Sequence, residues 1–401
     1  MNFTLMLAGT IVASTVHAAT PAVELVATCR VAGDSQDLSG LTGADAEGVP
    51  HALLGAFGSG IDFDTASGIM LAVCDRGPRD GDNDFACRVQ CFGLTIAGRS
   101  ATLTLKETHL LRSAGGGQFV GSSKAVGPAL RAQVGQHLTR IPARLDPESI
   151  RVVRDGSFWV AEEYGPSLDH FDATGRHLCR VTVPDRYRCA TPAASTEAEL
   201  AANSSGRQPN RGFEGLSLSP DGAMAWLMTQ SPLLQDHGLD GDRKRAGINM
   251  RLLRAPLDGG RPAEYLYLLD RPTHGVNELL VDDGDHLLVL ERDGKGGAEA
   301  VARTVYRVDV SRASDISGVD VLPVLGIPPG VTPVHKEVFL DLMDPAFGLA
   351  GGCMPEKIEG LAWGPALEDG RRTLLVSSDN DMRGDAPSVV WVFAIGPAGG
   401  R

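Results

Sequence analysis

The chain has 401 residues and a formal net charge of −13. This acidity argues against nucleic acid as a partner, because binding a phosphate backbone requires a net basic face. Hydrophobic residues make up 43% of the chain, which is enough for a sizeable core, and 49 Gly with 24 Pro are typical of a protein built from turns.

The first eighteen residues contain no Asp, Glu, Lys or Arg, and they end in Val16-His17-Ala18 before Ala19. This resembles a secretory signal peptide with a small-x-small cleavage site, although the basic n-region is missing. The alternative is an ordinary apolar N-terminal strand. We expect residues 1–18 to be removed and residues 19–401 to form a periplasmic or secreted monomer. No later run is long enough to span a bilayer.

Seven cysteines fit an oxidising compartment, so we expect disulfides. Cys179 and Cys189 flank an expected hairpin, and Cys74, Cys87 and Cys91 crowd one loop. The odd count leaves at least one cysteine unpaired.

Short apolar runs, separated by turn residues, predict strands along most of the chain. Asp-Gly pairs at residues 155–156, 221–222 and 283–284 precede the runs 158–161, 224–228 and 286–290, and such pairs are a strong hairpin signal. Residues 168–178 are expected to form an outer hairpin. Only residues 196–202 indicate a helix, of one or two turns.

An acidic residue followed by Gly or Ser and an aliphatic residue recurs at the start of several predicted strands. A second acid closes the strand that follows. Strand pairs that repeat with an acid at the same end predict an all-β fold, a single β-propeller whose axis collects carboxylates. Five copies can be counted, and the gap between Ser39 and Glu148 leaves room for a sixth, so five or six blades are expected. The copies begin at Glu148, Glu214 and Glu359, with degenerate copies at residues 38–41 and 277–280.

Carboxylates gathered at one mouth of the channel repel one another unless cations neutralise them. Calcium is the expected cofactor, because it accepts six to eight oxygen ligands in irregular geometry. The candidate metal ligands are Asp75, Glu148, Glu163, Glu278, Glu291, Glu359 and Asp379. Glu162 and Glu214 are expected to position water as catalytic carboxylates. The alternative for each single acid is that it caps a turn or pairs with a surface Arg.

Basic residues lie beside these acids, at Arg76, Arg211, Arg292 and Lys357. Arginine forks bind phosphate in a bidentate manner, and a nearby metal activates water. These four residues are therefore expected to bind a substrate phosphate and to stabilise charge in the transition state. The alternative is that they form ion pairs that hold the acidic mouth together.

Several of these segments resemble a known family. They are residues 75–78, 146–150, 162–166, 210–222, 357–361 and 378–381, and the run Asn210-Arg211-Gly212-Phe213-Glu214-Gly215 is the most specific. Over residues 36–396 the chain resembles the phytase-like proteins, also described by an "esterase-like activity of phytase". The resemblance implies a secreted or periplasmic propeller that is distantly similar to calcium-dependent β-propeller phytases. Ser149, in place of a more usual Gly, and Asn277-Glu278-Leu279 depart from the family pattern.

Two functions are therefore expected. The first is an exported, metal-dependent phosphoesterase, with calcium as the expected metal, that acts on a small phosphorylated substrate. The second is a non-catalytic, calcium-stabilised propeller that binds a ligand or a protein partner. No G-x-S-x-G or H-E-x-x-H motif occurs, which weighs against a serine esterase and a zincin.

Overall fold

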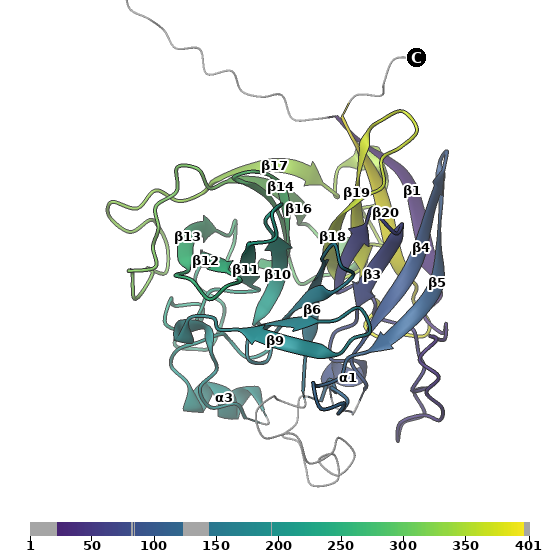
Figure 1. The fold of residues 1–401 in the computed structure, drawn as a ribbon. Helices are drawn as coiled ribbons and strands as arrows, with labels where there is room; N and C mark the ends of the chain where they lie inside the picture. The colour runs from purple at the N-terminus through teal and green to yellow at the C-terminus, as the bar shows by residue number, and fades with distance from the viewer. Residues whose placement is uncertain (1–21, 82, 84, 123–143, 194, 397–401) are drawn as a thin grey trace, which may run out of the picture.

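The computed structural model describes residues 22–81, 83, 85–122, 144–193 and 195–396. The expected signal peptide, residues 1–18, lies outside the described residues. The described residues form five four-stranded antiparallel sheets. The sheets are arranged around one axis as the blades of a propeller (Figure 1). The all-β prediction and the single propeller are confirmed, with five blades.

The first strand of each sheet lies next to the axis, because these strands contact one another in a closed ring. The inner strands are β2 (Gly60–Asp64), β6 (Pro147–Val152), β10 (Phe213–Leu218), β14 (Gly275–Asp283) and β18 (Ile358–Gly364). The second strands are β3 (Ile69–Val73), β7 (Phe158–Glu162), β11 (Met224–Thr229), β15 (His286–Arg292) and β19 (Arg372–Ser378).

The third and fourth strands complete each blade toward the outside. The third strands are β4 (Arg88–Ala97), β8 (Ser167–Phe171), β12 (Asn249–Pro256), β16 (Arg303–Asp309) and β20 (Ser388–Ile395). The outer strands are β5 (Ser100–Leu110), β9 (His177–Val181), β13 (Ala263–Leu268), β17 (His335–Asp341) and β1 (Val23–Val31). Because β1 pairs with β20 in register from Val23↔Ile395 to Val31↔Ser388, the two ends of the chain close the ring in one blade.

Helices are few and short in the described residues. They are α1 (Pro78–Gly81), α3 (Thr196–Ala202), η1 (Asp185–Tyr187), η2 (Gly297–Glu299) and η3 (Pro345–Phe347). The predicted helix at residues 196–202 is confirmed as α3. No described helix has both the length and the hydropathy needed to span a membrane.

The Asp-Gly turns were predicted correctly. Gly156, Gly222 and Gly284 have positive φ angles of 83°, 69° and 33°, and each joins an inner strand to the second strand of its blade. Glycine populates this region without the steric cost of a Cβ. The outer hairpin at residues 168–178 is also present, as β8 and β9.

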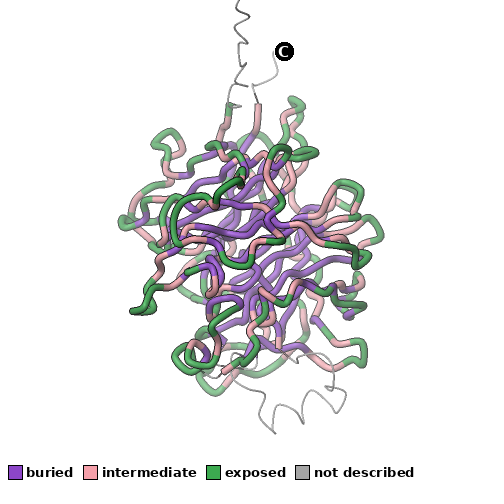
Figure 2. The backbone as a smooth tube through the Cα atoms, turned by 90° about the vertical axis from the view of Figure 1, so that its left-hand side faces the viewer, coloured by how far each residue is buried: buried purple, intermediate pink, exposed green. Residues whose placement is uncertain are grey.

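The hydrophobic core lies between neighbouring blades rather than at one centre. Each gap between adjacent sheets is filled by its own apolar cluster, and Phe57, Phe158, Phe213, Tyr267 and Phe393 are among the fully buried side chains. Figure 2 shows these buried strands crossing the molecule, with exposed residues confined mainly to the loops. The propeller is therefore a ring of sheet-on-sheet contacts that leaves polar groups free to gather at the axis.

Two sequence predictions are corrected here. Residues 38–41 are not a strand, and the first blade begins instead with β2. The predicted disulfides are not confirmed, because all seven cysteines are free thiols. Cys179 lies on β9, which pairs with β8, whereas Cys189 lies beyond η1, so the two cysteines do not face each other across a hairpin.

Candidate active site at the channel mouth

A β-bulge at the start of most inner strands explains the acidic repeat. The register shifts between Pro147 and Ser149 in β6, and between Phe213 and Gly215 in β10. The extra residue at each bulge is an acid that leaves the strand ladder, and bulges commonly re-aim a side chain in this way. Equivalent shifts in β14 and β18 give the mouth positions Glu148, Glu214, Asn277 and Glu359.

The Gly or Ser after the acid marks the place where two inner strands approach each other closely. A Cβ on Gly215 would lie 3.0 Å from the backbone nitrogen of Leu279, and one on Gly60 would lie 2.6 Å from the backbone oxygen of Glu148. The distance of 3.0 Å is tighter than ordinary van der Waals contact, and 2.6 Å is too short for any real Cβ. The repeat therefore combines an acid for the mouth with a small residue for the channel wall.

Blade four breaks this pattern by one residue. Its bulged residue is Asn277, and Glu278 occupies the position of the small residue in the other blades. The Glu278 carboxylate lies inside the channel and accepts hydrogen bonds from Ser149 Oγ at 2.7 Å and Leu216 N at 3.0 Å, with Arg151 Nη2 at 3.1 Å. Burial raises its pKa to about 8. Glu278 therefore lies deeper than the predicted metal site.

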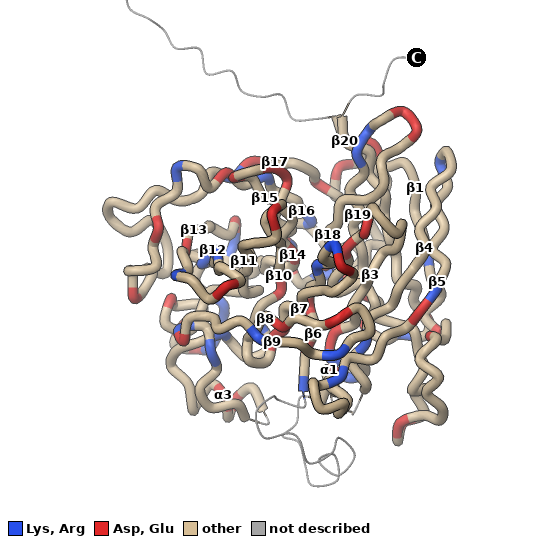
Figure 3. Tube along the Cα trace, in the orientation of Figure 1, with Lys and Arg blue, Asp and Glu red and all other residues tan. Residues whose placement is uncertain are grey.

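The residues that follow the second strands form a second ring of mouth positions. Pairing with the inner strands makes Asp75, Glu163, Gln230, Arg292 and Asp379 equivalent. Most residues of the two rings line one cavity of about 230 Å³. Acidic and basic positions alternate along the chain near α1 and β18 (Figure 3).

One acidic cluster in the mouth contains its own cation. Ligand oxygens of Asp75, Asp379 and Asp381 lie within 4.8 Å of one another. The Lys357 ammonium lies 3.1, 3.4 and 2.8 Å from these three carboxylates, respectively. Burial opposes ionisation of Asp75, but Lys357 and Arg76 outweigh it and lower the pKa of Asp75. Burial raises the pKa of Asp379 to about 8, against the effect of Lys357.

A second acidic cluster is only partly neutralised. Oxygens of Asp146, Glu148 and Glu163 also lie within 4.8 Å of one another, and all three residues are buried. Arg76 Nη1 lies 2.9 Å from Asp146 and 3.5 Å from Glu163. Glu163 Oε2 has no hydrogen-bond partner. Burial and the nearby Asp146 raise the pKa of Glu163 to about 8.

Glu148 and Glu214 are the most strongly perturbed acids of the mouth. Burial raises the pKa of Glu148 well above its usual value, and Glu214 and Asp146 raise it further. Burial also raises the pKa of Glu214 well above its usual value, together with Glu163 and Glu359. Glu214 Oε1 accepts a hydrogen bond from Gln230, and no cation lies within 4.0 Å of Glu214 in the described residues. Both carboxyls are therefore harder to ionise than an ordinary Glu side chain, and a bound cation would oppose this effect.

The basic residues differ in their partners. Arg292 Nη2 donates to Glu359 Oε1 at 2.7 Å. Arg211 instead donates to the neutral side chains of Gln230 and Ser231, and no carboxylate of the described chain lies within 4.0 Å of it. Burial lowers the pKa of Arg211. Arg211 is thus a partly buried guanidinium without a direct counter-ion among the described residues.

Two predicted site residues, Glu162 and Glu291, lie outside the mouth. Glu162 accepts hydrogen bonds from Tyr164 N, Gly165 N and Ser167 Oγ at 2.8–2.9 Å, within its own blade. Glu291 is surrounded by three donors, His274 Nδ1, Tyr267 Oη and Lys336 Nζ, at 2.7–2.8 Å. Both acids point to the opposite side of the strand from their neighbours Glu163 and Arg292, because side chains alternate.

The structure adds residues that the sequence patterns did not indicate. Asp146, Gln230, Asn277 and Arg245 complete the mouth. Asp146 immediately precedes the Pro147-Glu148 motif, so its closeness in sequence to Glu148 could have indicated it as a site residue. Asn277 lies in the degenerate copy at residues 277–280, where Glu278 rather than the amide was predicted to be the site residue. Gln230 and Arg245 come from a strand end and a loop, where no repeat marks them.

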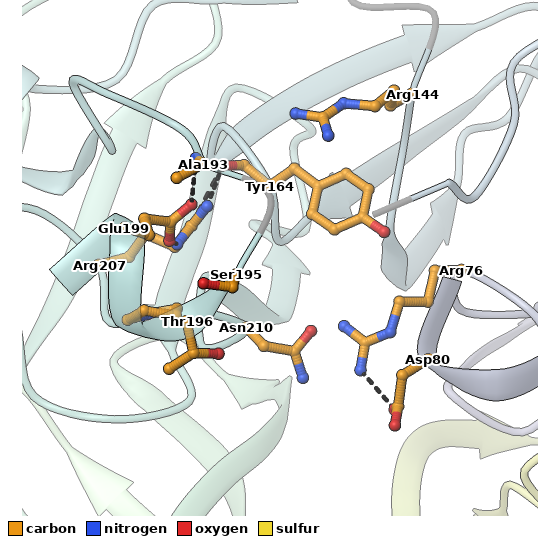
Figure 4. Close-up of a pocket in the computed structure, with 11 residues that line it drawn as sticks. Arg76, Asp80, Arg144, Tyr164, Ala193, Ser195, Thr196, Glu199, Arg207 and Asn210 are labelled. Carbon is orange, nitrogen blue, oxygen red and sulfur yellow. Dashed lines mark hydrogen bonds and ion pairs between the residues drawn. The ribbon is translucent and has the colours of Figure 1, made fainter. Parts of the chain in front are cut away.

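A second cavity of about 360 Å³ adjoins the mouth and shares Arg76, Asp80 and Asn210 with it. Figure 4 shows the Arg76–Asp80 ion pair, 2.9 Å long, on one side of this cavity. The Arg207–Glu199 pair lies on another side, next to α3. The mouth is therefore open laterally toward a polar side cavity.

Comparisons with known proteins place the chain in a family. The model of the phytase-like family, described as "esterase-like activity of phytase", matches residues 52–382. An "uncharacterized secreted protein" from Arthroderma benhamiae is 28% identical over 324 residues, and the match covers 63% of this chain and 62% of that protein. The chain thus spans less than two thirds of this curated relative.

Solved structures give only weak similarity. Regucalcin from Agrobacterium tumefaciens strain C58, titled a calcium-binding protein, has a TM-score of 0.37 with 12% identity, covering 85% of this chain and 92% of that chain. The allergen Mala s 1 from Malassezia sympodialis has a TM-score of 0.37 with 10% identity, covering 88% and 81%. Because these scores are low, the five-bladed architecture rests on the strand pairing itself.

Proposed function

We propose that this chain, which belongs to the phytase-like family, is an exported metal-dependent phosphoesterase with its active site in the channel mouth. Export is supported by the printed description of the relative from Arthroderma benhamiae as secreted. The activity is supported mainly by one observation. The cavity is lined by Glu148 and Glu163, which belong to a three-carboxylate cluster contacted by Arg76 alone, and by Arg211, which has no carboxylate within 4.0 Å in the described residues.

The cation site of this proposal is the cluster of Asp146, Glu148 and Glu163. Three carboxylates within 4.8 Å of one another supply the oxygen ligands that calcium prefers. The buried Oε2 of Glu163, which has no hydrogen-bond partner, fits a bound cation. A cation here would polarise a phosphoryl oxygen and lower the pKa of a bound water. It would also favour the ionised forms of Glu148 and Glu163, whose pKa values are raised by burial, because opposite charge favours the charged form.

The phosphate group is proposed to bind beside Arg211 and Arg292. Guanidinium forks match phosphate oxygens in geometry and charge. Arg292 shares one edge with Glu359, whereas its Nε has no hydrogen-bond partner. Arg76 and Lys357, which were also predicted to bind phosphate, are engaged with Asp146 and with the Asp75 cluster. We therefore assign these two residues to charge balance of the mouth.

Glu214 is proposed as the proton donor. Hydrolysis breaks the bond between phosphorus and the alcohol oxygen while the oxygen of water bonds to phosphorus, and the departing alkoxide needs a proton. Burial and like charges raise the pKa of Glu214, and a raised pKa favours the protonated form that this step requires. Glu214 lines the same cavity as Arg211 and Glu148, which supports this role.

The non-catalytic alternative is favoured by the ion pairs of the mouth. Lys357 contacts three carboxylates, and Arg76 and Arg292 each contact at least one. In that case a bound cation would only complete the charge balance, and the propeller would bind a ligand or a protein partner.

The deciding experiment measures phosphate release by the purified chain from a chromogenic phosphomonoester and from phytate, with calcium and after its removal. The phosphoesterase proposal predicts calcium-dependent release from at least one of them. Absence of release from both substrates, together with calcium binding measured by calorimetry, would favour the non-catalytic propeller.

A further inference from the structure

The two rings of mouth positions change character at blade four. At the bulge of the inner strand, Glu148, Glu214 and Glu359 are acids, whereas blade four has Asn277. After the second strand, blade four has Arg292 where three of the other blades have Asp75, Glu163 and Asp379. The blade that lacks the acids therefore faces the cavity with an amide and a guanidinium.

A third guanidinium reaches the same wall from the loop between β11 and β12. Arg245 Nη1 donates to the backbone oxygen of Thr273 at 2.8 Å. In the described residues, no carboxylate lies within 4.0 Å of Arg245. Burial and the like charges of Arg211 and Arg292 lower the pKa of Arg245 to about 10. Since guanidiniums repel one another, their convergence is costly unless an anion binds between them.

Asn277 is a buried polar side chain without a partner. It is 1% exposed, and neither its Oδ1 nor its Nδ2 forms a hydrogen bond. A buried amide without hydrogen bonds destabilises the fold unless a ligand satisfies it, and Asn277 lines the mouth cavity together with the guanidiniums. Its Nδ2 can donate to an anion oxygen, whereas an acid at this position would repel the anion.

We infer that Arg211, Arg245, Arg292 and Asn277 form an oxyanion pocket that selects the dianionic phosphate of a phosphomonoester. Arg245 and Asn277 are its recognition residues. The inference deepens the proposed function, and its choice of phosphate rests on that function. Arg211 and Arg245, which have no carboxylate within 4.0 Å in the described residues, favour a ligand with two negative charges. A phosphodiester, with one charge and a second substituent, satisfies the pocket less well in a cavity of about 230 Å³.

The test measures binding of inorganic phosphate by calorimetry at pH 8, after metals have been removed with an immobilised chelating resin, so that no soluble chelator competes as an anion. We expect wild type to bind phosphate and to bind perchlorate, a singly charged tetrahedral anion, at least tenfold more weakly. Arg245→Gln should weaken phosphate binding at least tenfold. Asn277→Asp, which restores the acid of the other blades, should abolish it.

Arg312→Gln is the matched control, because Arg312 is exposed on a loop, and it should bind phosphate as wild type does. Melting curves verify that each variant is folded. Arg245 is only partly buried, so Arg245→Gln decides the question if Asn277→Asp fails to fold. The inference is overturned if calorimetry detects no phosphate binding by wild type when the phosphate concentration is 10-fold that of the protein sites or higher. It is also overturned if folded Arg245→Gln binds phosphate as tightly as wild type does.

The same variants separate this inference from the proposed function. Loss of phosphate binding in Arg245→Gln, with a wild type that hydrolyses no phosphomonoester, would support the oxyanion pocket and contradict the phosphoesterase. Hydrolysis by Arg245→Gln with an unchanged KM would support the phosphoesterase and contradict the pocket.

Discussion

The two acidic clusters of the mouth are similar in composition and differ in what balances them. Each contains three carboxylates within 4.8 Å of one another. The cluster of Asp75, Asp379 and Asp381 surrounds the Lys357 ammonium at 2.8–3.4 Å. The cluster of Asp146, Glu148 and Glu163 has Arg76 at one edge only.

This difference shows that an acidic cluster by itself does not indicate a metal site. Asp75, Asp379 and Glu163 occupy equivalent positions in three blades. The first two, however, already share a cation of the protein itself, the Lys357 ammonium. In the described residues, Lys357 contacts all three carboxylates of its cluster, whereas no cation lies within 4.0 Å of Glu148 in the Asp146 cluster. The comparison therefore favours the Asp146 cluster as the proposed cation site and Lys357 as the internal cation of the other cluster.

Removing the internal cation should have the largest effect. Lys357→Met should lower the free energy of unfolding by about 3–5 kcal/mol, because it leaves buried carboxylates unpaired. It should also create a new calcium-dependent rise in melting temperature, since the vacated cluster then resembles the other one. Thermal and denaturant unfolding measure both effects.

Lys295→Met is the control for this variant, because Lys295 pairs with Glu299 at an exposed site and should contribute less than about 1 kcal/mol. Equal stability of Lys357→Met and Lys295→Met would contradict the structural role of Lys357.

Arg211→Ala should lower phosphomonoester turnover by about 10²–10³-fold, as loss of one charge-stabilising donor does. The fold should be little affected, because Arg211 has no carboxylate partner in the described residues. Activity and melting of this variant are compared with those of Arg312→Ala. A fully active but strongly destabilised Arg211→Ala would favour the non-catalytic propeller.

Calcium should stabilise the wild type by mass action, by about 2.7 kcal/mol at a concentration 100-fold above its Kd. Glu163→Gln should abolish this gain, because it removes a carboxylate from the Asp146 cluster. Asp381→Asn should retain it, because Asp381 belongs to the cluster that Lys357 balances. A calcium response lost in Asp381→Asn and retained in Glu163→Gln would reverse the assignment of the two clusters.

The smallest expected effect is a pH dependence of the metal-free protein. The folded-state pKa of Glu163, about 8, lies above its ordinary value of 4.5. The stability that its protonated form contributes is therefore present at low pH and is lost as the pH rises through 8. From pH 5 to pH 8, Glu163→Gln should gain at least about 1 kcal/mol over wild type, since one pKa unit corresponds to about 1.4 kcal/mol. Urea unfolding of both proteins at each pH measures this. A difference in free energy of unfolding between Glu163→Gln and wild type that stayed constant with pH would contradict the prediction.

The fold was largely predictable from the sequence because its signals are local. Asp-Gly turns and alternating apolar runs determine each hairpin through residues that are neighbours in the chain. The first blade was misplaced, because residues 38–41 match the acidic repeat no better than Ser59-Gly60-Ile61, which begins the inner strand. The cysteine pattern predicted disulfides, but it contains no information on which cysteines face each other.

The site was only partly predictable, because one-residue shifts decide which side chains face the mouth. In blade four, the bulge places the amide of Asn277 at the mouth, and the carboxylate of Glu278 then lies inside the channel. At Glu162 and Glu163, strand alternation selects the second acid. Arg245 arrives from a loop far from the repeat. These outcomes depend on register and tertiary packing, which a repeat pattern does not specify.

The pairing of β1 with β20 has a consequence for how the protein forms. Val23 and Ile395 are partners in one sheet although almost the whole chain separates them. The last blade lacks its outer strand until both segments have been synthesised, so folding must close a very long loop, and such non-local contacts slow folding. Completion of the ring therefore waits for the last strand of the chain to be synthesised.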